Sequence, residues 1–398
     1  MPDERIFFVN RVYWPSEAAT AQLLTDLAEG LVARGWAVQV IAAGSEPGPR
    51  HGVVIHRTGP GETHGGIFSR VLNYARFLGA ARRELRTHVR PGDVVVFLTD
   101  PPMLGVAGAG TARRGRARVV HWIQDVYPEI VSQHAGRWLA PLLWPLRWAR
   151  NSAWRAADCC APVGVDMLAT VRAFGVRADC AVTLPNWASP VLASPPDAAD
   201  VAAQRAAWEV TGKFVVAYSG NLGRVHLFAP ILAAAERLRD EPGVVFLFIG
   251  RGARFDEVRA AADARRLTNV RFLPPQPRDR LAVTLAAADA HFVTLRPGFE
   301  RLVSPSKLSG VLAAGRPALF VGPRGSELAG LLEREGCGMS FAPEEAGALA
   351  GAIKRLRDEP ARCEAVGRAA RACYERCFTF AAALAQWDEL LRRLAGTR

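Results

Sequence analysis

Short apolar runs alternate with longer amphipathic segments along this chain of 398 residues, and the whole alternation occurs twice. A buried strand of a parallel sheet is apolar on both faces, whereas a helix that covers such a sheet is apolar on one face only. The alternation therefore predicts parallel sheets with helices on both sides. In the first half we expect strands at 6–9, 37–41, 94–98, 118–123, 159–162 and 182–184, with helices such as 18–34 and 69–87.

The second half repeats the pattern after a change in composition. Residues 188–212 are rich in Ala, Pro, Ser and Asp and are predicted to form a linker with a short helix. Beyond it we expect strands at 214–218, 244–249, 270–272, 290–294 and 318–321, helices at 228–239, 255–265 and 305–314, and only helices over 343–397. Single cores stop growing near about 250–300 residues, so two domains are favoured. The prediction is an α/β protein with Rossmann-like domains at 1–187 and 213–378, facing each other across a cleft, and a C-terminal helix at 379–398 that could cross back to the first domain.

The composition bears on the location of the protein and on the kind of partner it binds. No apolar run reaches the roughly 18–20 residues that span a bilayer, and the acidic start from Met1 to Arg5 is unlike a signal peptide, so a cytoplasmic location is expected. The seven cysteines lack metal-ligand spacing, which favours core packing over a metal site or disulfides. A formal net charge of +12 favours anionic partners, meaning phosphates, nucleic acid or a lipid surface.

A glycine-rich turn follows the first strand of the second half. In a doubly wound sheet the ligand lies beyond the carboxyl ends of the strands, so this turn is a candidate site. Residues 218–224 read YSGNLGR. Gly220, Asn221 and Gly223 would let the backbone approach a phosphate, and Arg224 would add a positive charge. An ordinary strand-to-helix turn is the alternative.

Lysine is rare in this chain. Of 50 basic residues only Lys213, Lys307 and Lys354 are lysines. Lys307 lies in the segment LVSPSKL at 302–308, where a helix is expected to open near Pro305. A cation in the first helical turn opposes the helix dipole by about 0.3–1 kcal/mol, and a bound diphosphate would reverse that penalty. The alternative is a solvated surface lysine.

The segment HWIQDVYPE at 121–129 ends another predicted strand. His121, Asp125 and Glu129 could together position or deprotonate an acceptor hydroxyl. For His121 a core histidine bonded to the backbone is an equal alternative, whereas Asp125 and Glu129 lie past the strand end and are better candidates.

Residues 137–155 combine tryptophan with leucine and arginine. Four tryptophans fall within 138–154, and 112–155 contains eight arginines against two acids. Such a stretch suits the interface of an anionic membrane. A core helix with an arginine-bearing outer face is the alternative.

Together these segments resemble the GT4 family of glycosyltransferases, and within it the branch of colanic-acid and O-antigen biosynthesis enzymes. The resemblance extends over about 320 residues through pieces in a fixed order: YWPSEAAT at 13–20, PP at 101–102, QDVYPE at 124–129, PNW at 185–187, YSGNLG at 218–223, IGRG at 249–252, FLPPQ at 272–276 and PSK at 305–307. It implies a GT-B fold, retention at the anomeric carbon, a nucleotide-diphosphate sugar as substrate, and no metal or other cofactor.

The resemblance also implies roles for residues. Arg224 and Lys307 would neutralise the diphosphate with the amides of Val303 and Ser304, and Leu273, Pro274 and Gln276 would hold the base. Further substrate contacts would be Ser16, Glu17, Ala18, Asn186, Gly220, Asn221, Gly223, Gly250, Glu300 and Ser306. The glutamate pair that is usual in the family falls on Leu302 and Gly310, with Glu300 nearby.

We therefore expect a glycosyltransferase that acts on a glycan or lipid-linked acceptor in cell-surface polysaccharide synthesis, peripheral on the cytoplasmic face of the inner membrane. A sugar-nucleotide epimerase of the same architecture and a non-catalytic sugar-nucleotide or membrane-binding subunit are the alternatives. Nucleic-acid binding is disfavoured because the basic residues form no recognisable reading motif.

Overall fold

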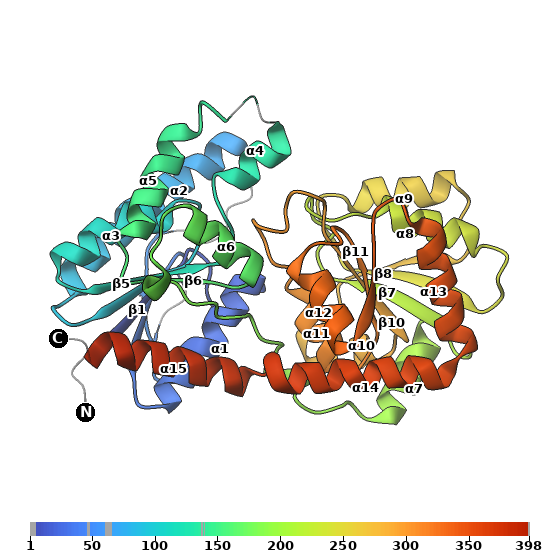
Figure 1. Cartoon of the computed structure of the whole chain (residues 1–398). Coiled ribbons are helices and arrows are strands. Elements are labelled where there is room, and N and C mark those ends of the chain that lie inside the picture. The colour runs from blue at the N-terminus through green and yellow to red at the C-terminus, as the bar shows by residue number, and fades with distance from the viewer. Residues whose placement is uncertain (1–4, 46–47, 60–65, 137, 139, 397–398) are drawn as a thin grey trace. The chain divides into compact units, whose positions relative to one another are not determined.

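The chain divides into two compact units. The computed structural model describes residues 5–45, 48–59, 66–136, 138 and 140–396. Unit 1 comprises Met1–Asn186, Arg301–Ser304 and Ala383–Arg398, and unit 2 comprises Trp187–Glu300 and Pro305–Ala382. Figure 1 shows a sheet with covering helices in each unit, and each unit is described by itself below.

Unit 1 is built on a six-stranded sheet in the order β3-β2-β1-β4-β5-β6, in which every neighbouring pair is parallel. This is the order of a doubly wound Rossmann sheet, whose ligand site lies where the order reverses, between β1 and β4. Its strands are β1 (Arg5–Val9), β2 (Ala37–Ala42), β3 (Val54–Arg57), β4 (Val94–Phe97), β5 (Arg118–Ile123) and β6 (Cys159–Pro162). Its main helices are α1 (Ala19–Ala33), α2 (Ile67–His88), α3 (Leu104–Arg114), α4 (Glu129–Ala135), α5 (Trp144–Arg155), α6 (Val165–Ala173) and α15 (Phe380–Gly396).

Unit 2 repeats this topology, with the order β12-β11-β10-β7-β8-β9 and the reversal between β7 and β10. Its strands are β7 (Phe214–Ser219), β8 (Val244–Ile249), β9 (Val270–Leu273), β10 (Ala290–Thr294), β11 (Ala318–Val321) and β12 (Gly338–Phe341). Its helices are α7 (Ala198–Ala207), α8 (Ala229–Arg237), α9 (Phe255–Ala264), α10 (Leu281–Ala286), α11 (Lys307–Ala313), α12 (Glu327–Glu335), α13 (Ala346–Asp358) and α14 (Pro360–Cys377). The segment 188–212, expected as a linker, lies within this unit.

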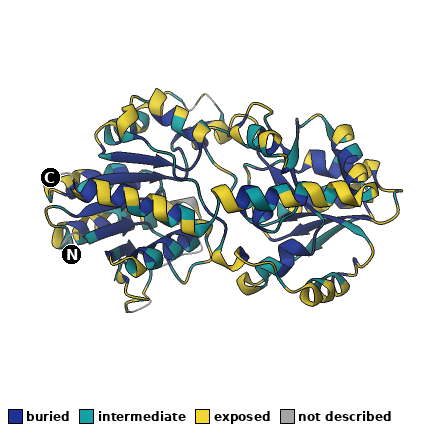
Figure 2. Ribbon diagram, turned by 60° about the horizontal axis from the view of Figure 1, so that its bottom comes forward, coloured by how far each residue is buried: buried dark blue, intermediate teal, exposed yellow. Residues whose placement is uncertain are grey.

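The central strands confirm the α/β prediction because their side chains are almost wholly buried, as the apolar runs required. Figure 2 shows these strands in dark blue and the outer faces of the helices in yellow. The strand expected at 182–184 is wrong. Its residues only run beside β6 through two hydrogen bonds, from Val182 N to Cys160 O and from Leu184 N to Pro162 O. Pro185 follows and has no N–H with which to continue the ladder.

The edge strands β3 and β12 are absent from the prediction. Both are partly exposed, and their residues, VIHR and GMSF, are too polar or too small to form an apolar run. Sheet edges bury less surface than central strands, so their sequences carry a weaker signal.

The C-terminal helix α15 packs on unit 1, with which its residues Ala383–Arg398 are grouped. The Trp387 ring lies 4.9 Å from that of Trp122, edge to face, and Trp36 Nε1 donates to Asp388 Oδ1 at 2.7 Å. Within the described part of the chain, no helix combines the length and the apolar character needed to cross a bilayer.

Candidate functional site

Glycines bring two loops of unit 2 into direct contact at the carboxyl edge of its sheet. Gly220 follows β7 with a φ of +124°, and Gly250 follows β8 with a φ of +139°. A Cβ atom on Gly250 would lie 2.2 Å from the main-chain oxygen of Gly220, and one on Gly252 would lie 2.5 Å from the nitrogen of Leu222. Both the backbone conformation and the space therefore require glycine at this point.

Lys307, the first residue of α11, lies against this turn. A Cβ atom on Gly220 would be 2.8 Å from its Cε atom, and its ammonium lies 5.1 Å from the centroid of the Tyr218 ring. Burial lowers the pKa of Lys307 from 10.5 to about 8. No carboxylate pairs with it among the described residues. The site thus holds a partly desolvated cation that lacks an anion.

His226 orients this lysine and is absent from the predicted site. Its Nδ1 atom lies 2.7 Å from the main-chain oxygen of Thr294, which can only accept, so Nδ1 carries the proton. The Nε2 lone pair then accepts from Lys307 Nζ at 3.2 Å. Burial, with the nearby lysine charge, lowers the pKa of His226 to about 3, so the imidazole stays neutral. The sequence did not indicate His226, because a single histidine in the apolar stretch after Arg224 matches no motif.

Arg224 is exposed on the loop that leads to His226. Its main-chain oxygen accepts a hydrogen bond from Arg296 Nη1 at 3.3 Å, and within the described ranges no carboxylate pairs with its guanidinium. Arg254 differs, since Glu257 binds it through two hydrogen bonds. Lys307 and Arg224 are therefore positive charges still available to an anionic ligand.

The other predicted residues of unit 2 lie on neighbouring loops. The loop after β9 is tied to the glycine turn through a hydrogen bond of 3.0 Å from Gly250 N to Leu273 O, and Gln276 Nε2 donates to Pro274 O at 2.9 Å. The carboxylate of Glu300 accepts from its own loop, at Gly298 N, at 2.7 Å. The remaining three, Asn221, Gly223 and Ser306, are exposed or half-buried on the surface.

The two positions where the resemblance places glutamates are apolar here, and each is packed. Leu302 is buried, and its oxygen accepts from Val126 N at 2.9 Å. A Cβ atom on Gly310 would lie 3.4 Å from Leu285 Cδ1 and 3.6 Å from Leu192 Cδ1. A carboxylate at either place would replace apolar contacts.

Val303 and Ser304, predicted to serve the second domain, belong by their contacts to unit 1. Val303 forms an isolated antiparallel bridge with Asp125. The four residues 301–304 therefore extend the carboxyl edge of the first sheet, next to the segment that was predicted to contact the acceptor.

Two aspartates mark the corresponding edge of unit 1. Asp125 follows β5, and Asp100 follows the neighbouring strand β4. Burial and the negative charge of Asp100 raise the pKa of Asp125 to about 6. Asp100 itself forms an ion pair of 2.9 Å with Arg11, which follows β1. Sequence reasoning selected Asp125 but not Asp100, which can be found only once β1, β4 and β5 are known to be neighbours.

Two other candidates in this region are a buried histidine and a glutamate in an ion pair. His121 is buried against α3, where a Cβ atom on Gly105 would lie 2.4 Å from its ring, and burial lowers its pKa to about 4. Glu129 is held by Arg150, which donates to its two carboxylate oxygens at 3.0 and 2.7 Å. Since Arg150 is itself almost wholly buried, Glu129 is needed to balance that charge. Burial of His121 and the pairing of Glu129 with Arg150 favour structural roles for both residues.

The early loop and Asn186 also have internal partners. Ser16 Oγ accepts from Ala18 N at 3.3 Å before α1, and Glu17 between them is exposed. Asn186 and Gln124 exchange two hydrogen bonds of 3.0 and 2.7 Å. This amide pair ties Asn186 to the residue before Asp125.

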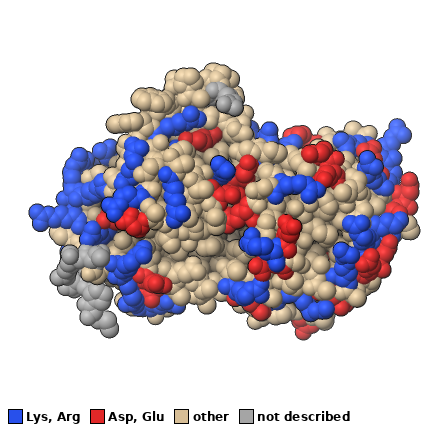
Figure 3. All heavy atoms as spheres, viewed as in Figure 1, with Lys and Arg blue, Asp and Glu red and all other residues tan. Residues whose placement is uncertain are grey.

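The tryptophan-rich stretch is mostly exposed. Trp138, Trp144 and Trp148 are 75%, 64% and 60% exposed, and Leu142 is 73% exposed, whereas Trp154 is buried. Arg137 and Leu139 lie outside the described residues. In Figure 3 the part of unit 1 that projects at the top of the view carries few charged side chains. The start of α5 and the turn before it therefore present an apolar surface.

Comparisons with known proteins agree along the chain. Residues 20–190 match the family model described as Glycosyltransferase Family 4, and residues 200–372 match that described as Glycosyl transferases group 1. The chain is 33% identical over 183 residues to the colanic acid biosynthesis glycosyl transferase WcaI of Escherichia coli K12, a match that spans 46% of this chain and 45% of that relative. It is 29% identical over 277 residues to the glycosyltransferase WbjE of Pseudomonas aeruginosa, covering 69% of this chain and 68% of the relative.

Solved structures share the fold. Sucrose-phosphate synthase from Thermosynechococcus elongatus superposes with a TM-score of 0.80 at 20% identity, covering 99% of this chain and 100% of that one. HepE of Anabaena in complex with UDP and glucose gives a TM-score of 0.75 at 17% identity, covering 98% and 100%. Two doubly wound units in series give the chain the GT-B fold of these structures. With both family models matched, the chain belongs to the family 4 glycosyltransferases.

Proposed function

We propose that the chain transfers a sugar from a nucleotide-diphosphate sugar to a hydroxyl of a glycan or lipid-linked acceptor, with retention at the anomeric carbon and without a required metal ion. The name of the relative WcaI, which refers to colanic acid biosynthesis, supports a role in polysaccharide synthesis, the name of WbjE supports glycosyl transfer, and the complex of HepE with UDP and glucose supports the donor class. The observation that carries the proposal is the half-buried Lys307 side chain, which packs against Gly220 and has no carboxylate partner among the described residues.

The chemistry follows from the leaving group. The bond from the anomeric carbon to the diphosphate oxygen breaks, and the electron pair stays on the diphosphate. The acceptor oxygen forms the new bond to that carbon, and its proton passes to a base or to the departing phosphate oxygen. Lys307 and Arg224 would stabilise the growing negative charge, and loss of one such donor costs about 10²–10³ in rate.

Asp125 is the group of unit 1 that we propose for the acceptor hydroxyl. With a pKa of about 6 it is mostly ionised at neutral pH and can accept a hydrogen bond or a proton. The Gln124–Asn186 amide pair beside it would hold it in place.

A lipid-linked acceptor accords with the exposed apolar surface. We propose that Trp138, Leu142, Trp144 and Trp148 enter the interface of an anionic membrane, which makes the protein peripheral on the cytoplasmic face. Tryptophan favours this interface because its ring is apolar while its N–H can remain hydrated. The net charge of +12 would add electrostatic attraction.

The proposal is tested by incubating the protein with radiolabelled UDP-, GDP- and dTDP-sugars and a membrane lipid extract. Label that moves into lipid or glycan supports transfer, whereas a new labelled sugar nucleotide indicates an epimerase. Thermal shifts with the same donors identify the base, since a ligand of the native state raises stability by mass action. Absence of both transfer and thermal shift with every donor would contradict the proposal.

A further inference from the structure

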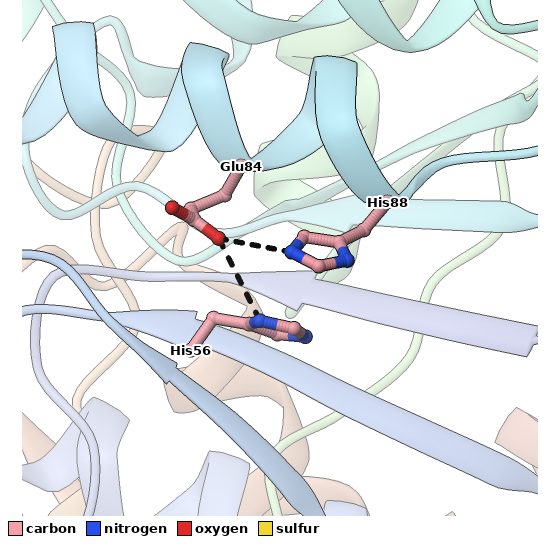
Figure 4. Close-up of side chains that lie close together, drawn as sticks. All are labelled: His56, Glu84 and His88. Carbon is pink, nitrogen blue, oxygen red and sulfur yellow. Dashed lines mark ion pairs between the residues drawn. The ribbon is translucent and has the colours of Figure 1, made fainter.

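Three potential metal ligands converge on the outer edge of unit 1, remote in sequence from every residue assigned above. His56 lies on the edge strand β3, and Glu84 and His88 lie four residues apart on α2, so that they share one helix face. Figure 4 shows the carboxylate of Glu84 beside the two imidazole rings, with one dashed line to each ring. Glu84 Oε2 lies 3.6 Å from His56 Nδ1 and 3.3 Å from His88 Nε2, and the three ligand atoms all lie within 4.8 Å of one another.

Two of these three spacings match a tetrahedral ion. Zinc binds imidazole nitrogen at about 2.0–2.1 Å and carboxylate oxygen at about 2.0–2.2 Å, and the tetrahedral angle then places neighbouring ligand atoms roughly 3.3–3.5 Å apart. Both distances from Glu84 Oε2 are already near that value. The set of two histidines and one carboxylate also suits first-row transition ions, whereas magnesium and calcium prefer oxygen alone.

The histidine of β3 is oriented for metal binding by a residue of the next strand. His56 Nε2 lies 2.8 Å from Gln39 Oε1 on β2. With Nε2–H as the donor to that oxygen, the lone pair of His56 is on Nδ1, the atom that faces Glu84. Metal-ligating histidines commonly donate their other N–H in this way, which fixes both the tautomer and the ring.

Local charge and access also suit an ion. The cation beside the cluster is Arg5, which donates to the main-chain oxygen of His88 at 2.6 Å, and Asp93 neutralises it in an ion pair of 2.7 Å. The His88 side chain is 36% exposed while His56 is 14% exposed, so the cluster opens to solvent on the helix side. Water can therefore complete the coordination.

We propose that His56, Glu84 and His88 bind one divalent transition ion of the zinc class. The ion would join α2 to β3, a strand that is hydrogen-bonded to the sheet on only one side. Because the site involves neither Lys307 nor Asp125, its role would be to stabilise unit 1, and sugar transfer would not need the ion.

The test uses the full-length protein, stripped with a chelator and titrated with Co²⁺ and Zn²⁺. We expect one Co²⁺ per chain with the visible absorption of tetrahedral coordination, displacement of Co²⁺ by Zn²⁺, and no competition from excess Mg²⁺. Zn²⁺ should also raise the melting temperature in proportion to the logarithm of its concentration.

Three variants and a control locate the site. His88→Gln and Glu84→Gln should each weaken Zn²⁺ binding at least about 100-fold. Gln39→Ala should weaken it about 10–100-fold, as is typical for the partner of a ligating histidine. The control is His51→Asn, at an exposed histidine whose φ of +47° asparagine tolerates, and it should bind as the parent does.

Two results would overturn the proposal. One is a parent protein that gives neither a Co²⁺ band nor a Zn²⁺ binding heat. The other is a His88→Gln variant that binds as tightly as the parent. Circular dichroism of the metal-free variants checks folding, and His88→Gln, at the most exposed of the three positions, is decisive if Glu84→Gln does not fold.

Discussion

Replacing Lys307 by methionine should raise stability and lower turnover at the same time. At pH 7 the buried ammonium, with its pKa lowered from 10.5 to about 8, costs about 3 kcal/mol, because each factor of ten in the proton equilibrium is worth about 1.4 kcal/mol. The variant loses the cation–π contact with Tyr218, about 0.5–1 kcal/mol, and the hydrogen bond to His226, about 1 kcal/mol. A net gain of about 1–2 kcal/mol remains.

Calorimetry and donor turnover should measure the two effects together. The gain corresponds to a rise in melting temperature of roughly 2–8 °C for a unit of this size, while turnover falls about 10²–10³-fold. The folded pKa is lowered, so the cost of the charge is full below pH 8 and disappears as pH rises from 8 towards 10.5. The stability difference between variant and parent should therefore shrink over that range. Lys213→Met, at the amino end of β7, is the control. A variant that is less stable and still active would refute the reasoning.

Three further changes probe the rest of the chain. Gly250→Ala would place a Cβ atom 2.2 Å from Gly220 O at a φ of +139°. Denaturant unfolding should show that the free energy of unfolding falls by at least about 2 kcal/mol, and nucleotide titration should show weaker binding. An unchanged stability and affinity would contradict the tight turn. Replacing Trp144 and Trp148 together by serine should reduce co-sedimentation with anionic vesicles at least about tenfold without changing the melting temperature, and equal binding would remove this surface as the membrane contact. The kcat/KM of the parent should fall as pH drops through about 6, where Asp125 becomes protonated; Asp125→Asn should have low activity without that acidic limb, and an unchanged limb in the variant would assign it to another group.

The central strands were predictable because a strand that is buried on both faces has to be apolar at nearly every position. Strands such as β5 and β8 are almost wholly buried, and their runs RVVHWI and VVFLFI have no competing interpretation. The edge strand β3, with the residues VIHR, is partly exposed along its length, so no apolar run remains to be detected. What the sequence could not contain was strand order, so the proximity of Asp100 to Asp125 had to come from the fold.

The site was predictable where a residue was unusual for its position. Gly220 and Gly250 follow buried strands, and Lys307 is a lysine in a chain that uses arginine. His121 and Glu129 have suitable chemistry, but His121 packs against Gly105 and Glu129 pairs with Arg150. Both partners lie elsewhere in the sequence. The sequence thus indicated the phosphate-binding turn more reliably than the acid–base groups. The conformation of a turn depends on neighbouring residues, whereas the partner of a side chain can lie anywhere in the chain.

Lysine at position 307 follows from the space that the glycine turn leaves. Its Cε atom already lies where a Cβ atom on Gly220 would be 2.8 Å away, and the Tyr218 ring lies 5.1 Å from its ammonium. The planar guanidinium of arginine, with five donors in a rigid fork, needs more room and keeps its proton under all conditions. An ammonium instead fits as a compact charge whose pKa can fall to about 8 when no anion is bound and return when a diphosphate arrives. The turn therefore accepts a compact cation with an adjustable pKa and disfavours arginine, the basic residue that this chain uses at most other positions.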